Sequence, residues 1–155
     1  MTGVQTCALP IWAGGVVFAA ARAIARFEDS MATVRAVTKA TEADFKALSA
    51  RALELGLNTK FSAVQAADSL VTLARAGFDV REAIESVDDV LQLAQAGGLA
   101  LSSAADIAAS ALRGFRLEVD QATRVVDVLV ETSNNANTNV EQLGNAMKFV
   151  APVAA

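Results

Sequence analysis

The sequence predicts an all-α protein, and three observations carry that prediction. The 155-residue chain contains 34 alanines, and alanine is the strongest helix former with the smallest helical side chain. Apolar residues recur at spacings of three and four, as on one face of a helix. Helix start and stop signals follow one another at short intervals. We expect about seven short-to-medium amphipathic helices, arranged as an irregular helical bundle or as stacked helical hairpins, without a sheet.

The first predicted helix runs from about residue 13 to residue 38. Its apolar positions fall three or four residues apart and form one stripe, made by Ile24, Phe27, Met31 and Val34. A second helix follows a capping box that extends from Thr41 to Asp44. We expect this helix to end at Gly56, because glycine tolerates the left-handed conformation that closes many helices.

The next two predicted helices also open with capping boxes. Ser62 and Gln65 begin one of them, which ends near Gly77. A similar box at 79–82 begins the other, and the glycine pair at 97–98 closes it.

The last three helices have less uniform signals. The fifth begins near Ser102 or Ser103, ends at Gly114 and is rich in alanine, so a neighbouring helix can approach it closely. The sixth is expected to be capped by Asp120. The seventh opens with a box at 138–141 and runs to Pro152 and beyond.

Two of these helices share an internal echo, which is a weakly repeated sequence pattern. Asp68 and Asp106 lie 38 residues apart, and so do Arg75 and Arg113. This spacing suits a repeated helical hairpin, but two copies are fewer than a repeat array needs.

The first residues resemble a translated nucleic-acid tag. A common sequencing-library adapter, read from a GTG start codon, encodes Met1 through Ile11 in order, and Trp12 fits a hybrid codon at the junction. We therefore expect residues 1–12 to be non-native and unstructured, and exclude them from the prediction of the fold. We expect residues 13–155 to be one helical domain that is truncated at both ends.

The composition argues against common catalytic and metal sites. The chain has no histidine and one cysteine, Cys7, which excludes a histidine-based triad, a Cys/His zinc site and an internal disulfide. The net charge is −4, with no cluster of Lys and Arg to neutralise phosphates. We expect no sequence-specific binding of nucleic acid.

The polar clusters have structural interpretations. Asp88 and Asp89 are neighbours on a predicted helix and point in different directions, so they and Glu85 are expected to form a solvated face. The asparagines between 134 and 139 favour a turn. We expect no catalytic, cofactor-binding or metal-binding residues and no enzymatic activity. The phenylalanines are scattered one per element and fit core or interface anchors: Phe27, Phe45, Phe61, Phe78, Phe115 and Phe149.

From Phe27 to Ala155 the chain resembles the core region of phage tail tape measure proteins, also called phage minor tail proteins. The order and spacing of several motifs carry this resemblance, although no single motif is diagnostic. The matching segments are 27–34 (FEDSMATV), 53–62 (LELGLNTKFS), 66–77 (AADSLVTLARAG), 90–97 (VLQLAQAG), 104–107 (AADI) and 126–129 (VDVL), with Asn134 onward.

The resemblance implies that residues 13–155 are a truncated tape measure core domain of a phage or prophage. Such proteins are multi-copy structural components of the virion tail that set tail length during assembly and leave ahead of the DNA during infection. They bring no catalytic residues. The implied partners are further copies of itself and the tail tube, tail tip and tail assembly chaperone proteins, with membrane contact only during infection. The implied locations are the virion tail and, before assembly, the host bacterial cytoplasm.

Two other functions are compatible with the residues. A soluble helical-repeat module that binds a protein would have the same helical pattern. A membrane-active helical protein is suggested by the mean hydropathy of +0.39.

Overall fold

The computed structural model describes residues 12–136 and 138–154, and within them every regular element is helical. The elements are α1 (Trp12–Thr38), α2 (Glu42–Asn58), α3 (Ala63–Arg75), α4 (Val80–Gly97), α5 (Leu101–Gly114), the short 3-10 helix η1 (Val119–Gln121), α6 (Ala122–Asn135) and α7 (Val140–Ala154). The predicted all-α fold is confirmed. We expected residues 1–12 to be unstructured, and residues 1–11 lie outside the described residues. Trp12 is described and is the first residue of α1, which differs from that expectation.

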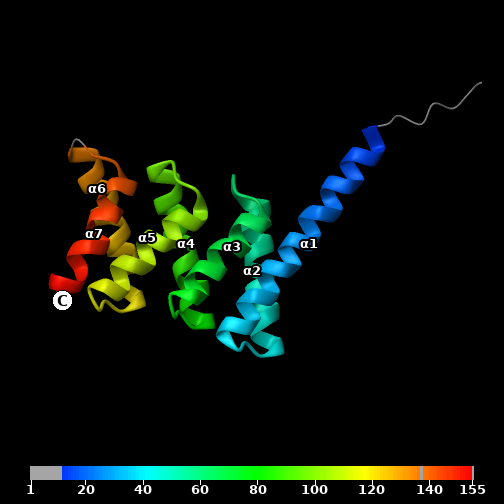
Figure 1. Ribbon diagram of the computed structural model, residues 1–155, viewed down its shortest axis with the longest axis horizontal. Helices are drawn as coiled ribbons and strands as arrows, with labels where there is room; N and C mark the ends of the chain where they lie inside the picture. The colour runs from blue at the N-terminus through cyan, green and yellow to red at the C-terminus, as the bar shows by residue number, and fades with distance from the viewer. Residues whose placement is uncertain (1–11, 137, 155) are drawn as a thin grey trace, which may run out of the picture.

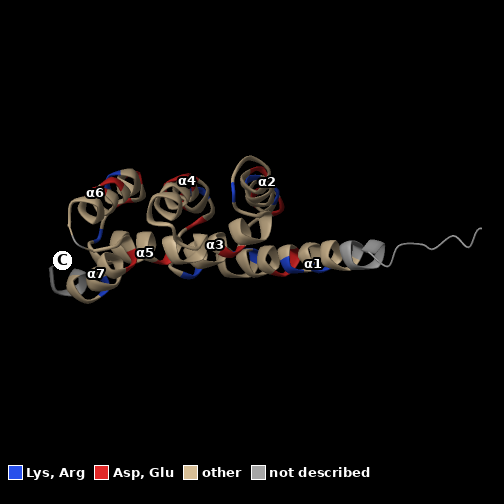
Figure 2. Ribbon diagram, turned by 90° about the horizontal axis from the view of Figure 1, so that it is seen from above, with Lys and Arg blue, Asp and Glu red and all other residues tan. Residues whose placement is uncertain are grey.

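The helices form two layers. Figure 2 shows α1, α3, α5 and α7 in one row and α2, α4 and α6 in the other. Within each row, neighbouring helices pack side by side, α3 between α1 and α5 and α4 between α2 and α6. The chain alternates between the rows and advances along the long axis of the molecule (Figure 1). Of the two predicted arrangements, stacked helical hairpins is the one observed.

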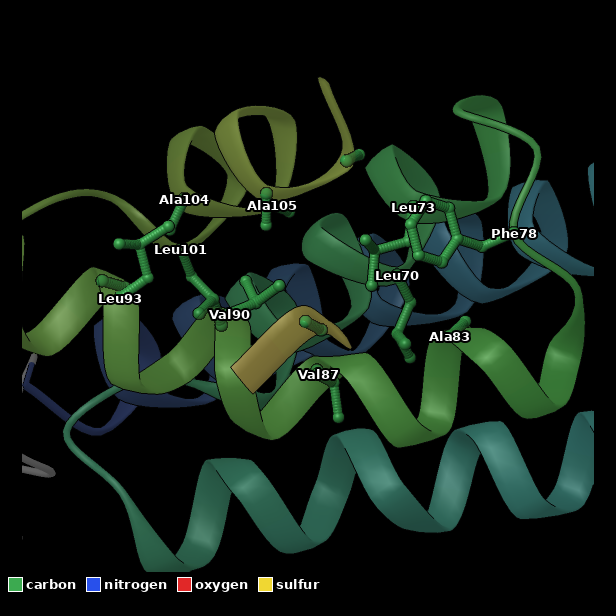
Figure 3. Close-up of a cluster of buried hydrophobic side chains, with 14 of the residues drawn as sticks. Leu70, Leu73, Phe78, Ala83, Val87, Val90, Leu93, Leu101, Ala104 and Ala105 are labelled. Carbon is green, nitrogen blue, oxygen red and sulfur yellow. The ribbon is translucent and has the colours of Figure 1, made fainter. Parts of the chain in front are cut away.

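The core lies between the two rows and runs the length of the stack. Figure 3 shows its centre, where Leu70 and Leu73 of α3 lie beside Val90 of α4 and Leu101 of α5, while Val87 points to the other side of α4. All five side chains are fully buried. Burial of such side chains contributes roughly 1.5–3 kcal/mol each relative to exposure, so this apolar seam holds successive hairpins together.

Helix α5 contacts both neighbours of its row through small side chains. Its buried residues include Ala104, Ala105, Ala108, Ala109 and Ala111. Because interaxial distance depends on side-chain size, these alanines let α3 and α7 approach α5 closely. The close approach predicted for this helix fits its heavily buried alanine surface.

The turns within the hairpins repeat one backbone feature. A residue with positive φ follows α1, α3 and α5, and these residues are Lys39, Gly77 and Arg116. They are separated by 38 and 39 positions, and each stands two residues before the N-cap of the next helix. The unit that the sequence showed twice is therefore present three times. Only one of the three left-handed residues is a glycine, which hid the pattern from the sequence.

The first three predicted capping boxes are confirmed. Thr41, Ser62 and Asp79 each accept a hydrogen bond from the backbone N–H three residues on, at 3.3, 3.2 and 2.8 Å. The side chains at those third positions return a bond to the cap backbone. Each box satisfies two N–H groups that a helix start leaves without intrahelical partners.

The predicted end of α2 was wrong. Helix α2 continues past Gly56 to Asn58, and a Cβ on Gly56 would lie 2.5 Å from the backbone nitrogen of Ala63. This glycine serves a close approach of the backbone, whereas we had predicted a left-handed cap. Helix α5 ends at Gly114 as predicted, and the left-handed residue that follows it is Arg116.

Helix α5 begins at Leu101, close to the expected start near Ser102, and its N-cap Ala100 makes no side-chain bond. Two predicted caps were wrong. Asp120 lies inside η1, ahead of α6, so it does not cap that helix. At the start of α7, Asn139 accepts a 2.8 Å bond from the N–H of Gln142, which replaces the predicted box at 138–141.

The apolar stripe of α1 is buried only toward its C-terminal end. Met31 and Val34 are in the core and Phe27 packs against it, whereas Ile24 is 60% exposed. Figure 1 shows the reason, because the N-terminal half of α1 extends beyond the neighbouring helices.

Candidate interaction surfaces

Polar side chains connect several neighbouring helices within each row. In one row, the Ser30 hydroxyl of α1 donates a 2.6 Å bond to Asp68 of α3, and Lys148 of α7 pairs with Asp106 of α5. These contacts supplement the apolar seam and fix the register between neighbouring helices. Their partly exposed positions limit each contribution to about 1 kcal/mol or less.

The adjacent aspartates of α4 bridge the second row. Asp88 pairs with Arg51 of α2 at 2.5 Å, and Asp89 accepts a 2.9 Å bond from the Thr123 hydroxyl of α6. The two carboxylates point to opposite neighbours, as their adjacent positions on a helix predict. The predicted solvated face therefore holds in part, because Asp88 is half exposed, but the partners of the two aspartates on neighbouring helices were not predicted. Glu85 is exposed and pairs with Arg81.

The environment of Asp89 disfavours its charge. Partial burial raises the pKa of the Asp89 carboxyl above its ordinary value of 3.8, while the bond from Thr123 opposes that rise. The nearby carboxylates of Asp88 and Asp127 raise the pKa further. This aspartate is a polar link between helices that is held at an electrostatic cost.

Arg113 at the end of α5 closes the preceding hairpin. Its guanidinium donates a 2.9 Å bond to the carbonyl of Gly77 and pairs with Glu82 at 3.2 Å. It also lies over the ring of Phe78. Arg113 belongs to the 38-residue echo, so one echoed position has a structural role between hairpins.

The other echoed pair makes contacts in opposite directions along the stack. Asp68 bonds back to α1, whereas Asp106 pairs forward with α7. The sequence identified these aspartates as equivalent but missed their partners. Nothing in the pattern marked Ser30, Arg51 or Thr123, because single polar residues on helix surfaces carry no periodic signal.

The asparagines and phenylalanines singled out in the sequence differ in how well they match their predicted structural roles. Asn139 caps α7, whereas Asn134 and Asn135 lie in α6, so the predicted turn was wrong for these two. Asn135 donates to the carbonyl of Glu131 within that helix. Asn137 lies outside the described residues. Phe61 and Phe78 are buried, whereas Phe149 is 81% exposed and is no part of the core.

The large exposed apolar side chains lie on the end helices of the stack. Among the residues with described side chains, they occur on α1 and α2 at one end and on α6 and α7 at the other: Phe18, Ile24, Val37, Leu53, Leu57, Val128, Phe149 and Val150. The middle helices α3, α4 and α5 carry none of them. Exposed apolar patches mark sites of association, so the two ends of the stack are its candidate interaction surfaces.

The end formed by α6 and α7 also contains a groove of about 430 Å³. Its walls come from the α5–α6 connection, α6 and α7, and include Phe115, Leu117, Arg124, Val125, Val128 and Met147. The lining is mainly apolar, with Arg124 as its charged member, which suits an amphipathic partner better than a small polar ligand.

Metal-ligand clusters and membrane-spanning helices are both absent from the described part of the chain. No group of three or more metal-ligating side chains comes together in it. None of its helices combines the length and the hydropathy needed to cross a membrane.

Comparisons with known proteins place the chain in a family. Residues 49–155 match the family model described as "Phage-related minor tail protein". The chain is 38% identical to the "Tape measure protein" of Pneumococcus phage Dp-1 over 128 residues, which are 83% of this chain and 11% of that protein. No solved structure matches.

Two more phage proteins show the same likeness. Identity is 28% over 145 residues with the "Probable tape measure protein" of Clostridium phage phiCD119, covering 91% of this chain and 15% of that protein. It is 33% over 113 residues with that of Escherichia phage P2, covering 72% of this chain and 14% of that protein. The chain thus spans less than a sixth of the length of these relatives. The resemblance predicted from the residues is confirmed, and the chain belongs to the phage-related minor tail protein family.

Proposed function

We propose that this chain is a compact assembly module of a phage tail tape measure protein, acting in tail assembly as part of a longer polypeptide. The observation that carries the proposal is the 38% identity to a tape measure protein over most of the chain. The architecture supports a structural role, because the groups that distinguish its surface are apolar side chains at the ends of a stack. Such surfaces fit protein partners.

In this role the module anchors the polypeptide or nucleates tail assembly. Tail length is set by extended helical sequence elsewhere in the polypeptide. A stack of short hairpins supports this division, because it folds its residues back on themselves. A segment that determines tail length gains length most efficiently as a continuous helix, at about 1.5 Å per residue. The proposed partners are other tail proteins, including the tail tube, tail tip and assembly chaperone proteins, and further copies of the same chain. The proposed location is the virion tail, after assembly in the host cytoplasm.

An in-frame deletion in a phage that carries this gene tests the module. Removing residues 27–150 takes out about 120 residues, which would span about 180 Å as a continuous helix. We expect this deletion to abolish tail formation, as seen by electron microscopy of lysates. A control deletion of equal length in an extended helical part of the same protein should give tails shorter by about that length. Infectious particles with tails shortened by 180 Å after removal of 27–150 would contradict the proposal.

The stacked hairpins also favour the alternative of a soluble helical-repeat module that binds a protein outside the tail. Mass spectrometry of purified virions separates the two functions. The tail role requires peptides of this chain in the particle, whereas the alternative places them in the lysate alone.

A further inference from the structure

We propose that the groove between α6 and α7 holds a further amphipathic helix of the same polypeptide, the second helix of a fourth hairpin that α7 begins. The inference concerns the architecture of the full-length protein and does not depend on the tail function. It rests on the position of α7, on the side chains of the groove and on the repeat that leads to it.

Helix α7 has the position of a first helix of a hairpin. It packs on α5 in the same row in which α5 packs on α3. Its capping residue Asn139 follows the N-cap of α5, Ala100, by 39 positions, and Ala100 follows Ser62 by 38. In the three preceding hairpins, each such helix is followed by a second-row helix that packs across it.

The groove is lined by residues whose equivalents, one repeat earlier in the sequence, are covered by the following hairpin. Val128 of α6 follows Asp89 of α4 by 39 positions, and Asp89 bonds to Thr123 on the next helix of its row. Among the described residues no helix follows α6 in its row, and Val128 is 55% exposed. At the hairpin turns, Leu117 corresponds to Phe78, which is 2% exposed, and Leu117 is only half-buried.

The side chains of the groove define the chemistry of the occupant. Val125, Val128 and Met147 offer an apolar floor, and Arg124 stands at its edge. A helix with apolar residues at spacings of three and four would cover this floor. A carboxylate on its flank would face Arg124, as Asp88 faces Arg51 between α2 and α4.

The same polypeptide is a better occupant than a second copy. The relatives are more than six times as long as the segment they share with this chain, which makes up 11–15% of them. The three hairpins follow one another through short connections. A helix tethered in this way meets its groove at a high effective concentration, whereas a second copy must first lose its translational freedom.

A cysteine at the groove measures its occupancy. In a Cys7→Ser background, Val128→Cys places one thiol on the groove floor, and Leu57→Cys, on the first hairpin, is the control. Each variant is extended at its C-terminus by the roughly 40 residues, one helical-hairpin repeat in length, that follow the matching region in the Pneumococcus phage Dp-1 protein. The matched control extension has the same composition in scrambled order. Maleimide labelling is followed for each protein, and amide exchange of α6 is followed in the extended chain that keeps Val128.

We expect the ordered extension to slow labelling at position 128 by about tenfold or more, as burial of a reactive group does. Labelling at position 57 should not change, and amide exchange in α6 should slow. Equal labelling and exchange with ordered and scrambled extensions would overturn the proposal. Protection of position 128 that rises with protein concentration in the unextended chain would also overturn it, because a second copy would then fill the groove.

Discussion

The guanidinium of Arg113 lies over the ring of Phe78, with its central carbon 4.5 Å from the ring centroid. The arginine ends α5 and the phenylalanine follows α3, so the contact joins one hairpin to the next. The same guanidinium bonds to the carbonyl of Gly77, the left-handed residue of that turn. One side chain therefore holds the turn of the preceding hairpin through a ring, a carbonyl and a carboxylate.

Replacing Arg113 with alanine should lower the free energy of unfolding by about 1–2 kcal/mol, because a cation–π contact and a charged hydrogen bond are both lost. Arg113→Lys should recover only part of this loss, since an ammonium group lacks the planar fork of the guanidinium. Arg75→Ala, one repeat earlier on an exposed side chain, is the control and should change stability by less than about 0.5 kcal/mol. Urea denaturation followed by circular dichroism measures all three. Equal losses for Arg75→Ala and Arg113→Ala would contradict the role given to Arg113.

Two buried serines should respond differently to replacement by alanine. The hydroxyl of Ser69 donates a 2.7 Å bond to the carbonyl of Ala66, whereas the buried hydroxyl of Ser86 has no hydrogen-bond partner among the described residues. Ser86→Ala should raise the free energy of unfolding by about 1 kcal/mol, and Ser69→Ala should gain less or lose stability. Both changes gain the same helix propensity, so the difference between them isolates the hydrogen bond. Thermal unfolding of the two variants checks the order.

The raised pKa of Asp89 makes stability depend on pH. Between the unfolded pKa near 3.8 and the higher folded pKa, the folded chain binds more protons, so stability falls as pH rises through this window. Asp89→Asn should remove that fall and raise the melting temperature at pH 7, while leaving stability near pH 3 almost unchanged. The amide oxygen can still accept from Thr123. The gain should be below about 1 kcal/mol, because the site is partly solvated.

The neighbouring aspartate provides the control for this pH effect. Asp88→Asn removes the charge that pairs with Arg51 and should lower stability at pH 7 by up to about 1 kcal/mol. Denaturation curves between pH 3 and pH 7 compare the two variants. A loss of stability at pH 7 in Asp89→Asn would show that its carboxylate is stabilising as an ion.

The helices and most of their starts could be predicted because local chemistry determines them. Thr41, Ser62 and Asp79 each have a partner three residues on, and the cap geometry follows from that spacing alone. The cap of α6 was predicted wrongly, and α5 begins near its predicted start without a cap signal. Ala100 makes no side-chain cap, and η1 precedes α6, so packing determines where these helices begin.

The stacking could be predicted only as one of two arrangements, because the repeat is carried by backbone conformation more than by residue type. Lys39 and Arg116 take positive φ at the positions where the equivalent turn has Gly77. Such conformations are uncommon for residues with a Cβ, and no local signal marks them. The groove at α6 and α7 could not be predicted either, since Phe115, Val128 and Met147 come from separate elements.

Two glycines allow close approaches of different kinds, and alanine substitution should distinguish them. A Cβ on Gly56 would lie 2.5 Å from a backbone atom of Ala63, whereas one on Gly144 would lie 2.6 Å from the Ile107 side chain. Gly56→Ala should cost about 1–3 kcal/mol, because the backbone at Ala63 has to move. Gly144→Ala should be costly alone, but shortening Ile107 removes the three atoms that it meets.

A double-mutant cycle tests the contact between α5 and α7. Ile107→Ala alone should cost about 2–5 kcal/mol through the cavity it leaves. Combined with Gly144→Ala, it should cost about 1–2 kcal/mol less than the sum of the single changes, because the new methyl group occupies part of that cavity. Gly56→Ala combined with Ile107→Ala serves as the additive control. Additive losses in both pairs would mean that α7 does not pack on α5 through Gly144, which would also remove the basis for treating α7 as the start of a fourth hairpin.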